Sequence, residues 1–155
     1  MLKQIKGLHH VTAMARDARL NNAFYSGALG LRRVKKTVNF DEPSVYHLYY
    51  GDAQGTPGTI MTHFPFPRIG AGRAGTGEVG RTVFSVPEGA LGYWQARLVA
   101  AGALDLEAGE NFGQKRLNFR SPEGDGLALV EVAADARTPW IGNGVAADQA
   151  IRGFH

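Results

Sequence analysis

The sequence has 155 residues, of which 44% are hydrophobic, a length typical of one domain with a core of its own. It contains no cysteine, which excludes disulfides and thiolate metal sites. The formal net charge is +3, and the one basic cluster, at residues 32–36, has no aromatic platform beside it, so nucleic acid is not an expected partner.

The sequence contains no pattern typical of a targeting or membrane segment. Its first six residues lack the apolar stretch of a signal peptide. The longest apolar-rich stretch, residues 96–106, is interrupted by Arg97, Gly102 and Asp105 and is too short to span a bilayer. We therefore expect a cytoplasmic protein that does not use a membrane as a partner.

The first part of the chain reads as strand, helix and three strands. Residues 8–14 form the expected first strand, and Asp17 after it is a good helix N-cap. Apolar residues then recur at helical spacing from Leu20 to Ala28, and Gly30 can end that helix. Alternating and aromatic-rich segments predict three more strands, at residues 31–40, 45–50 and 58–64.

The second part repeats this order after a glycine-rich connector, residues 68–80. A strand is expected at residues 81–86, and a helix follows from Pro87 or Glu88 to Ala101. Three further strands are predicted at residues 103–108, 114–120 and 126–133. The connector contains Gly-x-Gly-x-x-Gly at residues 70–75, but no strand leads directly into it and no helix follows, so we reject a dinucleotide site there.

These patterns predict an α+β fold of two βαβββ modules, residues 1–67 and 78–134, within one domain, residues 1–134. Each module needs the other, because one sheet with a single helix leaves a face uncovered. We expect the paired modules to form a curved, cup-like mixed sheet with the helices on the outside. The interior of such a cup is a natural ligand site.

The stretch from residue 135 to residue 155 reads as a linker followed by the start of a second domain. Pro and Gly become frequent in it. The sequence Ile-Lys-Gly-Leu-His at residues 5–9 recurs as Ile-Arg-Gly-Phe-His at residues 151–155, a shift of 151 − 5 = 146 residues. The alternative is an ordinary frayed tail.

Four positions emerge as candidates for a metal site when the two modules are aligned: His10, His63, Thr82 and Glu131. We expect them to point inward near the centre of the cup. Two imidazoles and one carboxylate can hold a divalent ion such as Fe(II) and leave positions open for substrate and O₂. For each residue alone the alternative is structural, a hydrogen-bonded strand histidine or a solvated glutamate.

Neighbouring residues have separate expected roles. Strand alternation places His10 and Thr12 on one face, and His9 on the other. If the strand end twists toward the cavity mouth, His9 can act as an acid or base near a phenolate bound by the metal. His47, flanked by aromatic residues, reads as structural or pocket-lining.

Several segments together resemble the vicinal oxygen chelate superfamily (glyoxalase, bleomycin resistance protein, extradiol dioxygenase), and more closely its branch of ring-cleaving dioxygenases acting on hydroquinones. The matching segments are GLHHVTAMARD, FYSGALGL, DEPSVYHLYYGDAQGTPGTIMTHFPFP, SPEGDGLALVEV and AIRGFH. The resemblance implies that His10 is an iron ligand and that His9 and Thr12 line the substrate side. It also implies a protein about twice this long, so the chain resembles an N-terminal half whose remaining His and Glu ligands lie in a second domain. His63 departs from the aromatic residue that the branch implies at its position.

The sequence therefore predicts an Fe(II)-dependent, extradiol-type ring-cleaving dioxygenase, or its N-terminal half, which uses O₂ on a small aromatic diol such as a hydroquinone or catechol. Mn(II), Ni(II) and Zn(II) are the alternative metals. A glyoxalase-like isomerase or lyase and a metal-free module that binds a small aromatic compound are the alternative functions. A half-protein exposes apolar surface, so we also expect a homodimer, and the isolated chain can be inactive.

Overall fold

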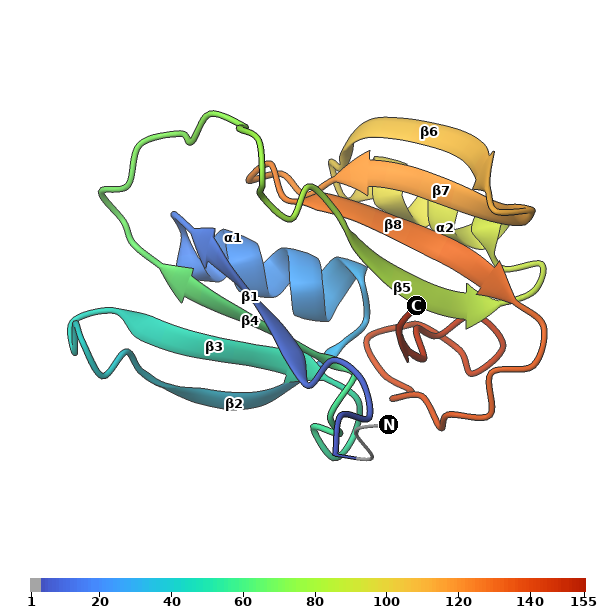
Figure 1. Cartoon of the computed structure of the whole chain (residues 1–155), viewed down its shortest axis with the longest axis horizontal. Helices are drawn as coiled ribbons and strands as arrows, with labels where there is room; N and C mark the ends of the chain where they lie inside the picture. Colours follow the sequence, from blue (N-terminus) through green and yellow to red (C-terminus); the bar gives the residue numbers. More distant parts are fainter. Residues whose placement is uncertain (1–3) are drawn as a thin grey trace.

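The computed structural model describes residues 4–155, so the first three residues of the expected first module lie outside the described part (Figure 1). The first half follows the predicted order of strand, helix and three strands. Its elements are β1 (His10–Ala15), α1 (Ala18–Asn22), a π-helical continuation η1 (Ala23–Ala28), β2 (Arg32–Val38), β3 (Tyr46–Gly51) and β4 (Ile60–Pro65). The strands form sheet A in the order β1-β4-β3-β2, with β1 parallel to β4.

The second half repeats this order and adds one short strand. Its elements are β5 (Thr82–Pro87), α2 (Leu91–Ala100), β6 (Leu104–Asn111), β7 (Gln114–Arg120), β8 (Gly126–Val132) and β9 (Gly153–Phe154). These strands form sheet B in the order β6-β7-β8-β5-β9. The α+β class and the βαβββ repeat are confirmed, although the strands form two sheets instead of one continuous cup.

The first helix begins where the sequence predicts. The side chain of Asp17 accepts hydrogen bonds from the backbone N–H groups of Arg19 and Leu20, at 2.7 and 3.0 Å, and so satisfies two of the free donors at the helix start. Gly30 ends the helix with a φ of +71°, a conformation that favours glycine. The π-helical second half was not foreseen, and it buries the neighbouring Phe24 and Tyr25 together.

One hydrophobic core joins the two halves. It contains the helix residues Trp94 and Leu98 as well as residues of both sheets. Phe24 of η1 reaches across to Phe119 of β7, with 6.5 Å between the ring centroids. The helices of both modules therefore pack in one shared core.

The turn before β8 ties the second half to the first. One carboxylate oxygen of Glu123 accepts hydrogen bonds from the backbone N–H groups of Arg16 and Asp17, at 2.7 and 2.9 Å. Asp125, two residues later, accepts a hydrogen bond of 2.9 Å from the hydroxyl of Tyr25. These contacts fix the orientation of the two modules.

The C-terminal stretch is not the free linker that its composition predicts. Val145, Ala150, Ile151 and Phe154 are buried in the core, and β9 pairs antiparallel with β5. Neither a helical nor a strand periodicity runs through this stretch, so the sequence pattern does not reveal their burial. Within residues 4–155, no helix is long and apolar enough to cross a membrane.

Candidate functional site

The candidate site lies on the face of sheet A that points away from the helix. Along β1, Val11 and Ala13 pack against the core, whereas His10 and Thr12 are exposed on the other face, as strand alternation predicts. The register of β1, β4 and β3 shows which side chains share this open face: His10, Thr12, Met14, His47, Tyr49, Ile60, Thr62 and Phe64.

Polar and aromatic groups pair across this open face. The hydroxyl groups of Thr12 and Thr62 are 2.9 Å apart. The hydroxyl of Tyr49 lies 2.8 Å from Nδ1 of His47, and the ring of His47 lies 4.0 Å from that of Phe64. Nε2 of His47 is buried without a hydrogen-bond partner among the described residues. The face therefore combines an apolar floor with a few directed polar atoms, as ligand sites do.

His9 and His10 place two imidazoles at one end of the face. Their Nδ1 atoms are 3.1 Å apart and the rings are nearly perpendicular, at 87°. Two nitrogens bound to one divalent ion at about 2.1 Å stand about 3 Å apart when they occupy adjacent positions. The two rings are hydrogen-bonded at this spacing, and the exposed imidazole of His10 fits one position of a metal site. No group of three or more His, Asp or Glu side chains able to hold an ion occurs within residues 4–155, so the described chain supplies an incomplete ligand set.

His63 does not lie with His10, contrary to the expected grouping. It pairs in register with Ala13, so its side chain points to the helix side of sheet A, and it is fully buried. Its ring lies 4.2 Å from the ring of Tyr25. Nε2 of His63 lies 3.6 Å from a carboxylate oxygen of Asp125, too far for a hydrogen bond but close enough for electrostatic attraction.

Thr82 and Glu131 also lie away from the open face, which corrects the expected arrangement. Both are on the side of sheet B that carries Phe84 and faces the core. The carboxylate of Glu131 accepts hydrogen bonds from the N–H groups of Gly89 and Leu91, at 2.9 and 3.2 Å, and so holds the start of α2. Thr82 was aligned one residue out of register with His10, and such a slip exchanges the two faces of a strand, whereas Glu131 was aligned with His63 and both point to the core side of their sheets.

Burial and neighbouring charges set the protonation of the polar groups. Burial lowers the pKa of His47, and the positive charges of His10 and Lys35 lower it further. Burial raises the pKa of Tyr49. Both groups are therefore neutral near pH 7, and the pair can accept or pass on a proton. The sequence indicated pocket lining for His47 but did not reveal Tyr49 or Thr62, although strand alternation could have placed all three on one face.

On the helix side, burial raises the pKa of Asp125, but the charge of His63 and the hydroxyl donors Tyr25 and Ser121 outweigh this effect, so the net pKa lies below 3.8. Burial and the carboxylate of Asp125 raise the pKa of Tyr25 well above its usual range. This arrangement keeps a neutral phenol donating to an ionised carboxylate between the modules. Its role is to join them.

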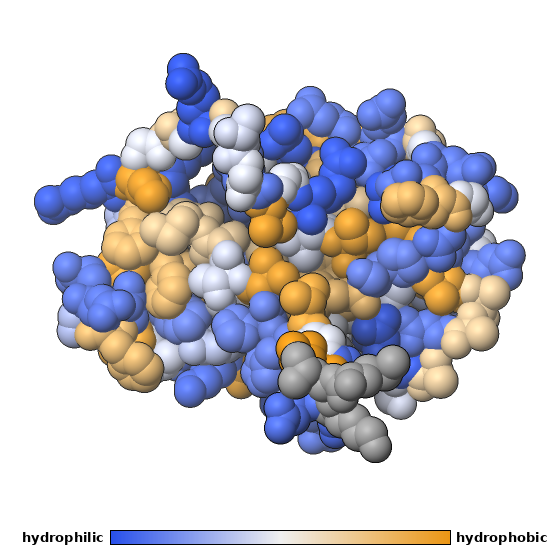
Figure 2. All heavy atoms as spheres, viewed as in Figure 1, coloured by the Kyte–Doolittle hydropathy of each residue, from blue (hydrophilic) through white to orange (hydrophobic). Residues whose placement is uncertain are grey.

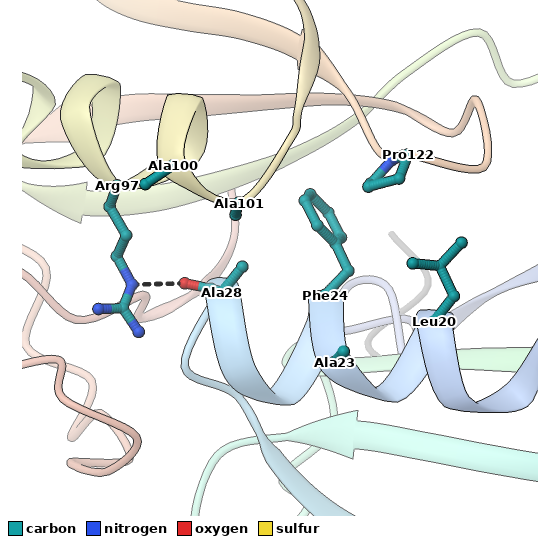
Figure 3. A pocket seen from close by; sticks show the side chains of 8 residues that line it. All are labelled: Leu20, Ala23, Phe24, Ala28, Arg97, Ala100, Ala101 and Pro122. Carbon is teal, nitrogen blue, oxygen red and sulfur yellow. Dashed lines mark hydrogen bonds between the residues drawn. The ribbon is translucent and has the colours of Figure 1, made fainter.

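Two hollows flank the sheet and the helices. One, of about 750 Å³, lies at the end of the open face and is bounded by Met14, Val45 and Phe66. The other, of about 390 Å³, lies between η1 and α2 (Figure 3). Its only charged lining residue is Arg97, which donates to the carbonyl groups of Ala28, Gly27 and Asn143. The second hollow therefore lacks a free reactive group.

Comparison with known proteins shows strong similarity over almost the whole chain. It is 50% identical to the Putative ring-cleaving dioxygenase MhqE of Bacillus subtilis over 96% of its length, and 37% identical to the chlorohydroquinone/hydroquinone 1,2-dioxygenase of Sphingobium indicum over 99% of its length. In each case it spans 49% of the relative, about half of that protein. No protein-family model matches the chain.

Solved structures agree with this similarity. A putative dioxygenase from Bacillus subtilis superposes with a TM-score of 0.89 at 42% identity, covering 96% of this chain and 47% of that one. A glyoxylase/bleomycin resistance protein/dioxygenase domain from Frankia has a TM-score of 0.66 at 18% identity, covering 82% of this chain and 92% of that one. The second match concerns the fold alone.

Proposed function

Because the chain belongs to the vicinal oxygen chelate superfamily and is similar to about half the length of several ring-cleaving dioxygenases, we propose that it is the His10-bearing half of a metal-dependent ring-cleaving dioxygenase. Its substrate would be a small aromatic diol such as a hydroquinone or catechol, and its metal Fe(II). The observation that carries the proposal is the exposed His10 at the edge of a face lined by hydroxyl, phenol and imidazole groups.

His10 would hold the metal, with His9 beside it. When bound, such an ion would supply a shared binding point for a phenolate oxygen of the substrate and for O₂, whose two atoms would both end in the ring-opened product. The chain's own residues would orient the substrate. Thr12 would offer its hydroxyl group to a diol oxygen, the buried hydroxyl of Thr62 would orient it, and the apolar side chains of Met14 and Phe64 would keep water from the ring.

His9 and the Tyr49–His47 pair would accept and transfer the proton that the diol hydroxyl group loses. A diol hydroxyl must lose its proton to bind as a phenolate, and a neutral imidazole can accept it. Tyr49 can donate to His47 at 2.8 Å, which keeps its phenol oxygen oriented as an acceptor on the open face. Neither role needs a residue outside this chain.

The missing ligands would come from a second unit of the same fold, either another domain or the partner in a homodimer. The N–H group of Gly58 donates to the carbonyl of His9, and the carbonyl of Gly58 accepts from the N–H of Phe154, both at 2.8 Å. The segment that repeats residues 5–9 therefore ends beside the strand that carries His10. Because residues 151–155 pack on this domain, the proposed second unit would lie beside this part of its surface.

In the test, the purified chain is loaded with Fe(II) under anaerobic conditions. Diol binding is then measured without O₂, and oxygen uptake is measured after O₂ is added. We expect 4-nitrocatechol to ionise on binding, with a red shift of its absorbance, and hydroquinone or catechol to consume O₂ if the second unit is present. Mass spectrometry with ¹⁸O₂ should show two labelled oxygen atoms in the product. Turnover without O₂ would favour an isomerase or lyase, and diol binding that survives a chelator would favour a metal-free binding module.

A further inference from the structure

Two five-residue segments with the same sequence pattern lie in different environments in this protein. Residues 5–9 and residues 151–155 share the pattern Ile-basic-Gly-apolar-His. The two glycines have the same unusual backbone conformation, with φ of +142° at Gly7 and +143° at Gly153. Yet Ile151 and Phe154 are 6% and 8% exposed, whereas Ile5 and Leu8 are 76% and 64% exposed. Figure 2 shows apolar side chains at the surface beside the start of the chain.

The buried copy is held as an antiparallel strand on the edge of β5. The N–H groups of Arg152 and His155 donate to the carbonyl groups of Ser85 and Val83, both at 2.9 Å. The ring of Phe154 packs on that of Phe84, with 5.3 Å between the centroids. Backbone pairing thus fixes the register, and two apolar side chains supply the burial.

Glycine is required in this docked position for two reasons. A Cβ on Gly153 would lie 2.5 Å from Nη1 of Arg137 and 2.8 Å from the carbonyl oxygen of Gly58, and the positive φ also favours glycine. At Gly7 a Cβ would meet nothing within 4 Å. The exposed copy therefore has the sequence pattern and the glycine φ of the docked copy without the surface that the docked copy contacts.

We propose that residues 5–9 dock on the β5-type edge of a second unit with this fold, in the way that residues 151–155 dock on β5 here. Among the hydrogen bonds of the described residues outside regular strands, the backbone of residues 5–9 makes one, from the N–H of Gly58 to the carbonyl of His9. The apolar side chains of this segment, Ile5 and Leu8, are mostly exposed to solvent. The relatives are about twice as long as this chain, which leaves room for such a unit. The inference does not depend on the proposed chemistry.

The test uses a variant of the full chain in which residues 151–155 no longer pair with the edge of β5. Gly153→Val clashes with Arg137 and Gly58 and should release residues 151–155 from β5. Two such molecules can then exchange residues 5–9 reciprocally. We expect the variant to self-associate about tenfold or more tightly than the unmodified chain in sedimentation equilibrium, since each exchange buries two apolar side chains. The double variant Gly7→Val with Gly153→Val should lose this gain, and Gly7→Val alone should match the unmodified chain.

Phe154→Asp provides a second route to the vacant edge if Gly153→Val does not fold, as judged by circular dichroism. A fluorescent peptide of residues 4–9 should bind either variant and not the unmodified chain, whose edge is filled. The proposal is overturned if both variants keep the association state of the unmodified chain, or if they associate equally well when Gly7 is replaced. Because the readout is mass and peptide binding, a negative result here is distinct from a failure of metal binding or turnover.

Discussion

At the scale of single residues, Asp125 is the polar group on which the contact between the modules most depends. Its carboxylate receives the hydroxyl groups of Tyr25 and Ser121 at 2.9 and 3.0 Å and faces the buried His63. Removing a charged acceptor leaves buried donors without a strong partner. We predict that Asp125→Asn lowers the free energy of unfolding by about 1–3 kcal/mol at pH 7, measured by urea denaturation.

The same substitution has a predictable pH dependence. The folded-state pKa of Asp125 is depressed, so its stabilising effect is fully present above its unfolded pKa of about 3.9 and is lost as the pH falls through the lower folded value. The difference between Asp125→Asn and the unmodified chain should therefore shrink below pH 4. Asp105→Asn is the matched control, because its salt bridge to Arg120 is exposed and contributes little. A difference that is constant down to pH 2 would contradict this account.

Glu131 illustrates a residue whose expected and observed roles differ. Its carboxylate holds the N–H groups at the start of α2, where a negative charge is favourable. We predict that Glu131→Ala costs about 0.5–2 kcal/mol of stability and leaves the metal content unchanged, as measured by denaturation and by elemental analysis. If a folded Glu131→Ala variant lost its bound metal, Glu131 would be a metal ligand and this prediction would be wrong.

At the scale of elements, Arg97 connects α2 to the end of η1. Its guanidinium donates to the carbonyl groups of Gly27, Ala28 and Asn143, each at 2.7 Å; Figure 3 shows the bond to Ala28. Carbonyl groups at a helix end lack partners within the helix, and a cation there is favourable.

We predict that Arg97→Ala lowers the free energy of unfolding by about 1.5–3 kcal/mol, and that Arg97→Lys recovers only part of it because an ammonium group cannot match the planar fork. Urea denaturation measures both. Arg73→Ala, in the exposed connector, should change stability little. Equal effects at the two positions would show that Arg97 acts only through general charge.

Secondary structure was largely predictable, because alternation and helical spacing are local properties. The pattern of β1 placed His10 opposite the helix, and Asp17 marked the start of α1. The relation between modules was not predictable in the same way. Two short strands of different sequence can be aligned in more than one register, and a one-residue error reversed the face of Thr82 relative to His10. The burial of Ile151 and Phe154 depends on the distant edge of β5, which no local pattern reveals.

At the scale of the whole molecule, the chain presents one open sheet face and one exposed docking segment. Under the two proposals above, a second unit of the same fold would complete both surfaces. The described residues provide His10 and His9 at the edge of the open face, whereas His63 lies across the sheet in the core. We therefore assign metal binding to His10, proton transfer beside it to His9, and interface stability to His63.

The most direct test of this assignment measures binding of a divalent metal to the purified chain by equilibrium dialysis and elemental analysis. His63→Gln, in a folded variant, should keep the affinity of the unmodified chain. His10→Ala should weaken it by about tenfold or more, since it removes one of the two exposed imidazoles. Unchanged metal affinity in His10→Ala would contradict the central claim.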